Sequence, residues 1–144
     1  EDDRLCVVKF HASWCKSCQK FGIRYKKLAL QEGDKIDRRG AVLEKGRVRF
    51  AEVEFTANAD LCKTLGVHKL PYIHIYSGSK GRVADFACGP KNFPLVIEKM
   101  NKFLDKKMSH FDKTMEAGSA LGDHIATELQ DQHFEEAASK VRKA

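Results

Sequence analysis

The chain has 144 residues, 42% of them hydrophobic and 32% charged, and its formal net charge is +6. This composition suits one globular domain with a core, and no run approaches the ~18 apolar residues of a membrane-spanning helix. The charged start, residues 1–4, lacks the pattern of a signal or transit peptide, and no motif for binding nucleic acid is recognisable.

The first elements follow the order strand, helix, strand. Residues 5–10 form a short apolar run that predicts a buried strand. From Cys18 the apolar residues recur at helical spacing until Gly33, which predicts an amphipathic helix. Residues 33–47 are charged and rich in glycine, and we expect a loop there, with room for one short turn of helix. Residues 48–55 predict a second strand, parallel to the first.

The later elements complete an α/β fold with a mixed sheet. We expect a short helix at 58–65, a strand at 72–76 and a strand at 82–87 that pairs with it as a hairpin. A further helix should follow the Gly89-Pro90 break and pack on the sheet through an apolar stripe.

Charge is distributed unevenly along the chain. Residues 16–49 contain eleven Lys and Arg but four Asp and Glu, which we interpret as a solvated helix face. A surface that attracts acidic protein partners is the alternative. Residues 105–144 have eight acidic and six basic residues, contain no proline and predict no strand. We therefore divide the chain into a domain at 1–104 and a helical C-terminal extension at 105–144, which we expect to contact a partner or a larger assembly.

Cys15 and Cys18 form a CxxC pair between the first strand and the first helix. A cysteine at a helix N-terminus lies beside unpaired N–H groups and the positive end of the helix dipole, which favours its thiolate. We expect Cys15 to be the nucleophile, Cys18 to resolve the mixed disulfide, and Lys16 to add a nearby positive charge. Half of a zinc site is the alternative, but no second ligand pair is present, so we expect neither metal nor cofactor.

Two segments carry a family resemblance: FHASWCKSC at residues 10–18 and LGVHKLP at residues 65–71. They resemble the active-site and cis-proline signatures of the thioredoxin family, and the resemblance extends over residues 5–104. It implies a thioredoxin-like fold and protein disulfides or dithiols as substrates. It also implies a cis bond at Leu70-Pro71 facing the dithiol, with Trp14 shielding the two cysteines.

A closer resemblance is to the plastid group of atypical cysteine/histidine-rich thioredoxins of plants and algae. It is carried by WCKSC at 14–18, LCKTLGV at 61–67, LPYIHIY at 70–76 and DFAC at 85–88. It implies a chloroplast protein, in the stroma or at the thylakoid surface, that moves redox equivalents to plastid partners. A non-catalytic docking module in a plastid assembly, anchored by residues 105–144, is the alternative function.

Several residues depart from the family pattern. Lys9 occupies the position of a buried carboxylate that assists the second thiol, which predicts slow exchange. Lys16-Ser17 replaces the usual Gly-Pro between the cysteines, which predicts an altered reduction potential. The family also has a strand and a helix before its active-site strand, and we expect this unit to be missing here, leaving residues 5–10 or a neighbouring strand exposed at an edge.

The remaining cysteines have no close spacing. We interpret Cys6 as part of the core, and Cys62 and Cys88 as small buried hydrophobes, with regulatory oxidation as the alternative for these two. His11 lies near the dithiol in the sequence and could tune it or serve packing alone.

Overall fold

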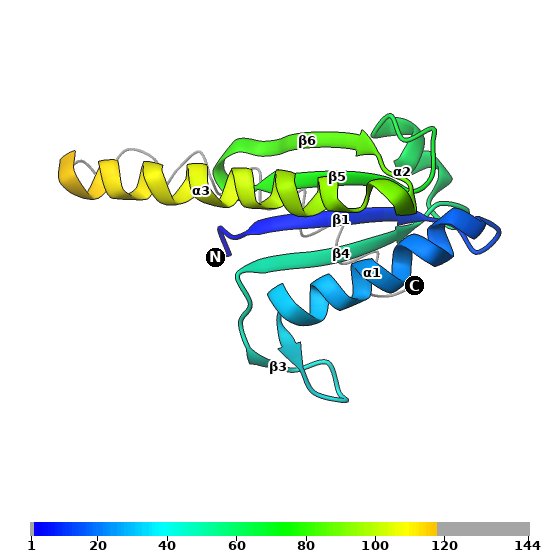
Figure 1. Ribbon diagram of the computed structural model, residues 1–144, viewed down its shortest axis with the longest axis horizontal. Helices are drawn as coiled ribbons and strands as arrows, with labels where there is room; N and C mark the ends of the chain where they lie inside the picture. The colour runs from blue at the N-terminus through cyan, green and yellow to red at the C-terminus, as the bar shows by residue number, and fades with distance from the viewer. Residues whose placement is uncertain (1, 118–144) are drawn as a thin grey trace.

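The structure, a computed structural model, describes residues 2–117. Its centre is a four-stranded mixed sheet with the order β4-β1-β5-β6 (Figure 1). Strand β1, Leu5–His11, pairs in parallel with β4, Val48–Glu54. It pairs antiparallel with β5, Tyr72–Ser77, which in turn forms an antiparallel hairpin with β6, Gly81–Ala87. The predicted mixed sheet is therefore confirmed, and β4 rather than β1 lies at its edge.

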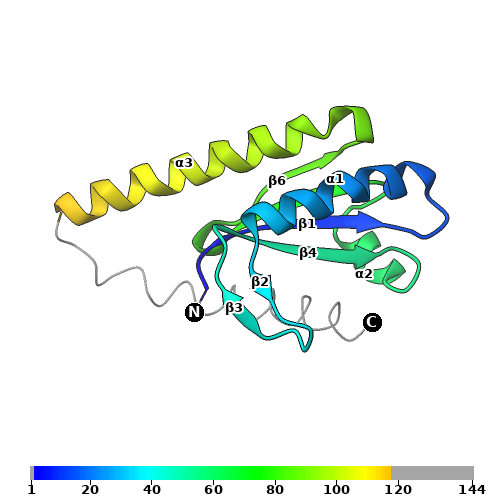
Figure 2. The ribbon, with the colours of Figure 1, turned by 60° about the horizontal axis from the view of Figure 1, so that its bottom comes forward.

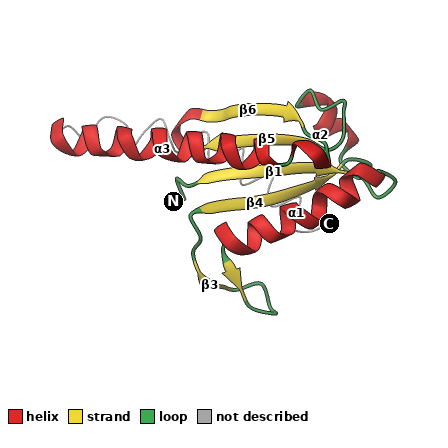
Figure 3. Ribbon diagram, viewed as in Figure 1, coloured by secondary structure: helices red, strands yellow, loops and turns green. Residues whose placement is uncertain are grey.

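Helices cover both faces of this sheet. The parallel pairing of β1 and β4 needs a crossover, which α1, Lys16–Glu32, provides. Helix α1 and α3, Pro94–Ala117, lie across one face of the sheet (Figure 3), and the short α2, Ala59–Thr64, packs on the other. Two 3₁₀ turns connect elements, at Gly78–Lys80 and Pro90–Asn92.

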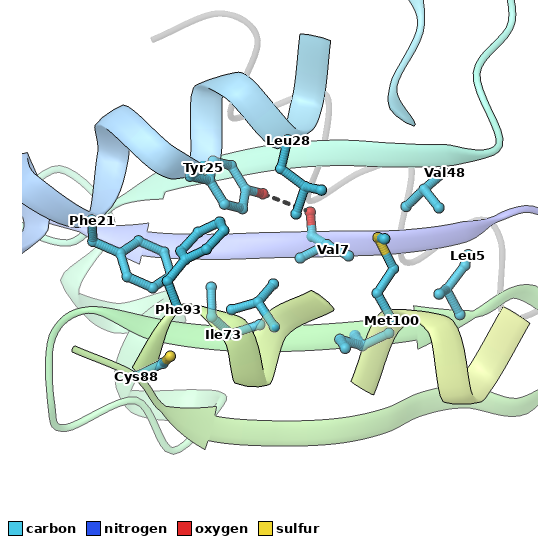
Figure 4. Close-up of a cluster of buried hydrophobic side chains, with 12 residues drawn as sticks. Leu5, Val7, Phe21, Tyr25, Leu28, Val48, Ile73, Cys88, Phe93 and Met100 are labelled. Carbon is cyan, nitrogen blue, oxygen red and sulfur yellow. Dashed lines mark hydrogen bonds between the residues drawn. The ribbon is translucent and has the colours of Figure 1, made fainter. Parts of the chain in front are cut away.

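The alternation of β1 divides the core into two clusters. Leu5 and Val7 point to the face covered by α1 and α3, where they meet Phe21 and Met100 (Figure 4). The Tyr25 hydroxyl lies 3.0 Å from the Val7 carbonyl oxygen and 2.8 Å from that of Ala51, on the neighbouring strand. On the opposite face, the second cluster is built from Cys6, Val8, Phe10, Val53, Cys62 and Val67. Side-chain alternation on a strand accounts for this division.

Residues 33–47 differ from the expected loop. They contain a small antiparallel hairpin of β2, Lys35–Ile36, and β3, Val42–Glu44, and no helical turn. Its turn is formed by the Asp37 carboxylate, which accepts hydrogen bonds from the N–H groups of Arg39 and Ala41. Figure 2 shows this hairpin extending away from the sheet beside β4.

Helix α3 continues without a break through the predicted boundary after Leu104. Phe103 and Leu104 pack against the core, and the Lys107 ammonium lies 2.9 Å from an Asp3 carboxylate oxygen. The later part of the predicted extension, residues 118–144, lies outside the described residues. Among the helices that are described, none combines the length and apolar character needed to cross a membrane.

Candidate active site

The fold brings Cys15 and Cys18 together at the start of α1. Cys15 is the N-cap residue of the helix, and its sulfur accepts a hydrogen bond of 3.2 Å from the Cys18 N–H. The two Cα atoms are 5.2 Å apart and the sulfurs are at bonding distance, as a disulfide. The predicted pair is thus assembled in the oxidised form, with the first cysteine at the positive end of the helix dipole.

The environment of Cys15 favours a thiolate once the disulfide is reduced. The first turn of α1 contains no acidic residue, and the Ser17 hydroxyl lies 3.4 Å from the Cys15 sulfur. Lys16 is exposed at the same turn. Unpaired helix N–H groups, a hydroxyl and a nearby cation all stabilise negative charge on sulfur.

An apolar wall with one exposed aromatic ring surrounds the dithiol. Leu70 and Phe55 pack against the buried cluster of Ala12, Cys15 and Cys18. The Leu70-Pro71 bond is cis, as the family resemblance implied. Trp14 is 65% exposed, and its indole N–H donates a 3.2 Å hydrogen bond to the Thr56 hydroxyl. Trp14, directly before Cys15 in the chain, therefore exposes its ring at the surface and is held in place from the loop after β4.

A buried ammonium, paired with a half-exposed carboxylate, lies beneath α1. Lys9 of β1 is 5% exposed, and its ammonium is 2.7 Å from a Glu52 carboxylate oxygen and 5.0 Å from the centre of the Tyr25 ring. Lys9 and Glu52 are direct partners in the parallel register of β1 and β4. Sequence reasoning found Lys9 but missed Glu52. The available signal was the alternation of residues 48–55, which places Glu52 on the same face as apolar Val48 and Phe50.

Two histidines in the sheet stay neutral near pH 7. Burial, and then the charge of Lys9, lower the pKa of His11 below its usual value. Burial lowers the pKa of His74 to about 4. His74 faces the opposite side of the sheet, where its ring meets Phe10 with centroids 4.7 Å apart and its Nδ1 lies 3.1 Å from the Tyr76 hydroxyl. Of these two histidines, His11 is on the α1 face, where the charge of Lys9 acts on it.

The other three cysteines are buried and divided between the two faces. Cys6 and Cys62 belong to the cluster under α2, whereas Cys88 belongs to the cluster under α1 and α3. Burial raises the pKa of the Cys62 and Cys88 thiols, which makes them poor nucleophiles. Within residues 2–117, no three His, Cys, Asp or Glu side chains gather in an arrangement that could hold a metal ion.

Comparison with known proteins places this geometry among thioredoxins. The thioredoxin family model matches residues 1–102. A chloroplastic thioredoxin-like 2 protein of Oryza sativa is 33% identical over 91 residues, covering 63% of this chain and 36% of that protein. A chloroplastic thioredoxin-like 2-2 protein of Arabidopsis thaliana is 31% identical over 86 residues, covering 60% of this chain and 31% of that protein. The chain thus spans about a third of the length of these curated relatives.

Solved structures give the same fold. Thioredoxin f2 of Chlamydomonas reinhardtii is 28% identical, with a TM-score of 0.55 over 72% of this chain and 82% of that chain. Fasciola hepatica thioredoxin has a TM-score of 0.55 at 23% identity, over 69% of this chain and 81% of that chain. The predicted thioredoxin-like fold is confirmed by these neighbours and by the sheet order.

Proposed function

The chain belongs to the thioredoxin family, and from that premise we propose that it exchanges its Cys15–Cys18 dithiol with disulfides of plastid proteins. The observation that carries the proposal is the position of Cys15 as the N-cap of α1, with the Cys18 sulfur at bonding distance. This arrangement favours the attacking thiolate and places the resolving sulfur within reach of any mixed disulfide.

The exchange proceeds in two displacements. In the reduced protein the Cys15 thiolate attacks one sulfur of the target disulfide, and the other target sulfur leaves as a thiolate that takes a proton from water. Cys18 then loses its proton and attacks the Cys15 sulfur, so the second target sulfur leaves in turn. Two electrons have passed to the target, and the protein holds the Cys15–Cys18 disulfide. The reverse sequence oxidises a target dithiol.

The surroundings suit a polypeptide substrate. Leu70 and Phe55 form an apolar wall at the dithiol, and Trp14 exposes a large ring beside it. Aromatic and aliphatic surface next to a reactive sulfur can hold a segment of a target during attack. A plastid location is supported by the chloroplastic relatives in rice and Arabidopsis, and electron transport among plastid proteins is the process in which such exchange would serve.

A trapping experiment tests this function. Cys18→Ser should leave Cys15 able to attack but unable to be released, so covalent complexes with target proteins should accumulate and disappear on reduction. Cys15→Ser is the matched control and should trap nothing. The proposal fails if the wild-type Cys15–Cys18 pair does not form and break reversibly when thiols are alkylated before and after mild reduction.

We also propose that residues 105–144 form a docking extension that is separate from the chemistry. The favouring observation is α3, which projects past the end of the sheet where β1 begins (Figure 1). Residues 105–109 on this helix are mostly exposed, and Lys107 makes its one described ion pair with Asp3. Ending the chain after Ser109 should keep exchange and lose partner proteins in a pull-down. A shortened protein that loses exchange would place the extension within the catalytic unit.

A further inference from the structure

A glycine in α1 leaves space for the buried ammonium of Lys9 directly under this helix. Gly22 lies in the middle of α1, and a Cβ atom at this position would be 3.3 Å from the Lys9 ammonium. Such a contact is tighter than ordinary packing, so glycine at this position lets the ammonium approach the helix backbone. Glycine inside a helix costs about 1 kcal/mol of stability relative to alanine. Space for the Lys9 ammonium is a physical reason for a glycine at position 22 despite this cost.

The geometry of a helix relates this ammonium to Cys18. Gly22 follows Cys18 by four residues, so the two positions lie on one face of α1, with Cβ positions about 5–6 Å apart. Cys18 is buried on this face together with Phe21 and Tyr25. The Lys9 ammonium thus lies against the position one helical turn after Cys18, on the buried face of α1.

The partner of Lys9 does not cancel its field at Cys18. The Glu52 side chain is 53% exposed on the edge strand, whereas the Lys9 side chain is 7% exposed. Water screens the carboxylate more than the ammonium, so the net field on the helix side is positive. Tyr25 on α1 also faces Lys9, and Ile73 of β5 is its partner on the other side. The charges of Lys9 and Glu54 both act on His11, two residues further along β1. His11 and Tyr25 are neutral near pH 7, because burial lowers the pKa of the first and raises that of the second.

We propose that Lys9 sets the ionisation of Cys18, with Glu52 and Gly22 as positioning residues that hold the ammonium under the dithiol. This inference rests on the proposed exchange at Cys15 and Cys18. After the first displacement, Cys18 must lose its proton before it can attack the Cys15 sulfur. The Lys9 charge stabilises the thiolate that results, and the proton goes to water. A position expected to hold a base thus holds a cation that acts electrostatically and takes up no proton.

The test is a titration of the Cys18 thiol in a Cys15→Ser background. The ultraviolet absorbance of the thiolate is followed against pH, and the Cys15→Ser/Cys18→Ser protein is subtracted to remove the other thiols and the tyrosines. Lys9→Met should raise the midpoint by about one pH unit, as expected for loss of a unit charge at this separation. Glu52→Gln should lower it by a smaller amount, because the ammonium then acts without an opposing carboxylate.

Opposite directions for the two substitutions separate electrostatics from structural damage. A variant that merely loosened α1 would move the midpoint in the same direction whichever partner was removed. Glu52 lies at a half-exposed edge, so Glu52→Gln keeps the test decisive if Lys9→Met does not fold. Arg47→Met is the matched control, since it breaks the Arg47–Glu32 pair of 2.8 Å at the far end of α1 and should leave the midpoint unchanged.

Failure of this inference and failure of the proposed function look different. The inference is overturned if Lys9→Met leaves the Cys18 midpoint unchanged, or if both substitutions move it the same way, while the wild-type protein still exchanges disulfides. The proposed function is overturned if the wild-type protein does not exchange disulfides, whatever the titration shows.

Discussion

Strand β1 carries a cation near each end, and the two have different surroundings. Arg4, just before the strand, donates to the carboxylates of Asp2 and Asp34 and to the Gly46 carbonyl oxygen, which is 2.8 Å away. Lys9, near the other end, has one carboxylate partner among the described residues, Glu52. The guanidinium is enclosed by acceptors, whereas the ammonium is paired on one side and faces the dithiol helix on the other.

The comparison shows that an ion pair in this fold can either hold two segments together or act on the reactive thiols. Which of the two it does depends on the groups that lie beside it. The Arg4 network ties the chain start to the base of the β2–β3 hairpin, since the Asp34 carboxylate also accepts from the Gly46 N–H at 2.8 Å. It holds the pKa of Asp2 at about 2 and lowers that of Asp34. The Lys9 pair joins two strands that are already paired, so its field on α1 is its distinct contribution.

The largest expected effect concerns His74, whose side chain is fully buried on β5. Its Nε2 has no hydrogen-bond partner among the described residues, and burial lowers its pKa to about 4. In the unfolded chain His74 therefore takes up a proton near pH 6.5, whereas in the folded protein it does so only near pH 4. The free energy of unfolding should fall by about 3 kcal/mol as the pH drops through this window, at ~1.4 kcal/mol per unit.

Urea unfolding at several pH values measures this loss. His74→Phe keeps the ring contact with Phe10 and should flatten the curve between pH 6.5 and pH 4. Asp2 should then remain visible as a separate loss of stability below its ordinary value of 3.8, toward pH 2. An unchanged slope between pH 6.5 and pH 4 in His74→Phe would show that another group carries the effect.

Removing Arg4 should give the next largest effect. Arg4→Met removes the guanidinium from Asp34 and leaves Asp2 with the more distant Arg49, whose Nε is 3.7 Å away. We expect a loss of about 2 kcal/mol in the free energy of unfolding. The Cys18 titration midpoint should stay unchanged, because Arg4 lies at the opposite end of β1. Urea unfolding and the thiolate titration on one preparation check both results. A shifted Cys18 midpoint would contradict the distinction drawn between the Arg4 network, which stabilises the fold, and Lys9, which acts on Cys18.

The smallest effect is expected at Gly22. Gly22→Ala adds up to about 1 kcal/mol of helix propensity, partly offset by the contact with the Lys9 ammonium. Net stability should change by less than ~1 kcal/mol. The Cys18 midpoint should nevertheless rise, by less than in Lys9→Met, because the ammonium is pushed away from α1. Thermal unfolding and the same titration measure the two quantities, and a midpoint at the wild-type value would count against the role of Gly22.

The features that could be predicted from the sequence are those that a local pattern of residues determines. The apolar run of β1, the helical stripe of α1 and the CxxC spacing together predicted the dithiol at a strand–helix junction. The cis bond at Leu70-Pro71 followed only from family resemblance, because a cis proline depends on tertiary contacts rather than on its neighbours in sequence.

Other features depend on contacts between distant residues. The β2–β3 hairpin has strands of two and three residues, all exposed, so no hydrophobic alternation marks them. Its base is fixed by Arg4, which is distant in the sequence. Glu52 became the partner of Lys9 through strand register, which the sequence of either strand alone does not specify.

The central claim is that Cys15 and Cys18 form a working redox couple, and a glutathione redox titration tests it most directly. The fraction of paired thiols is read by alkylation at each ratio of reduced to oxidised glutathione. We predict reversible two-electron behaviour with a potential above about −270 mV, the thioredoxin value, because Lys16-Ser17 lacks the stiffening proline and Lys9 stabilises the reduced, thiolate-bearing form. Failure of the two thiols to pair, or a potential at or below about −270 mV, would contradict the account.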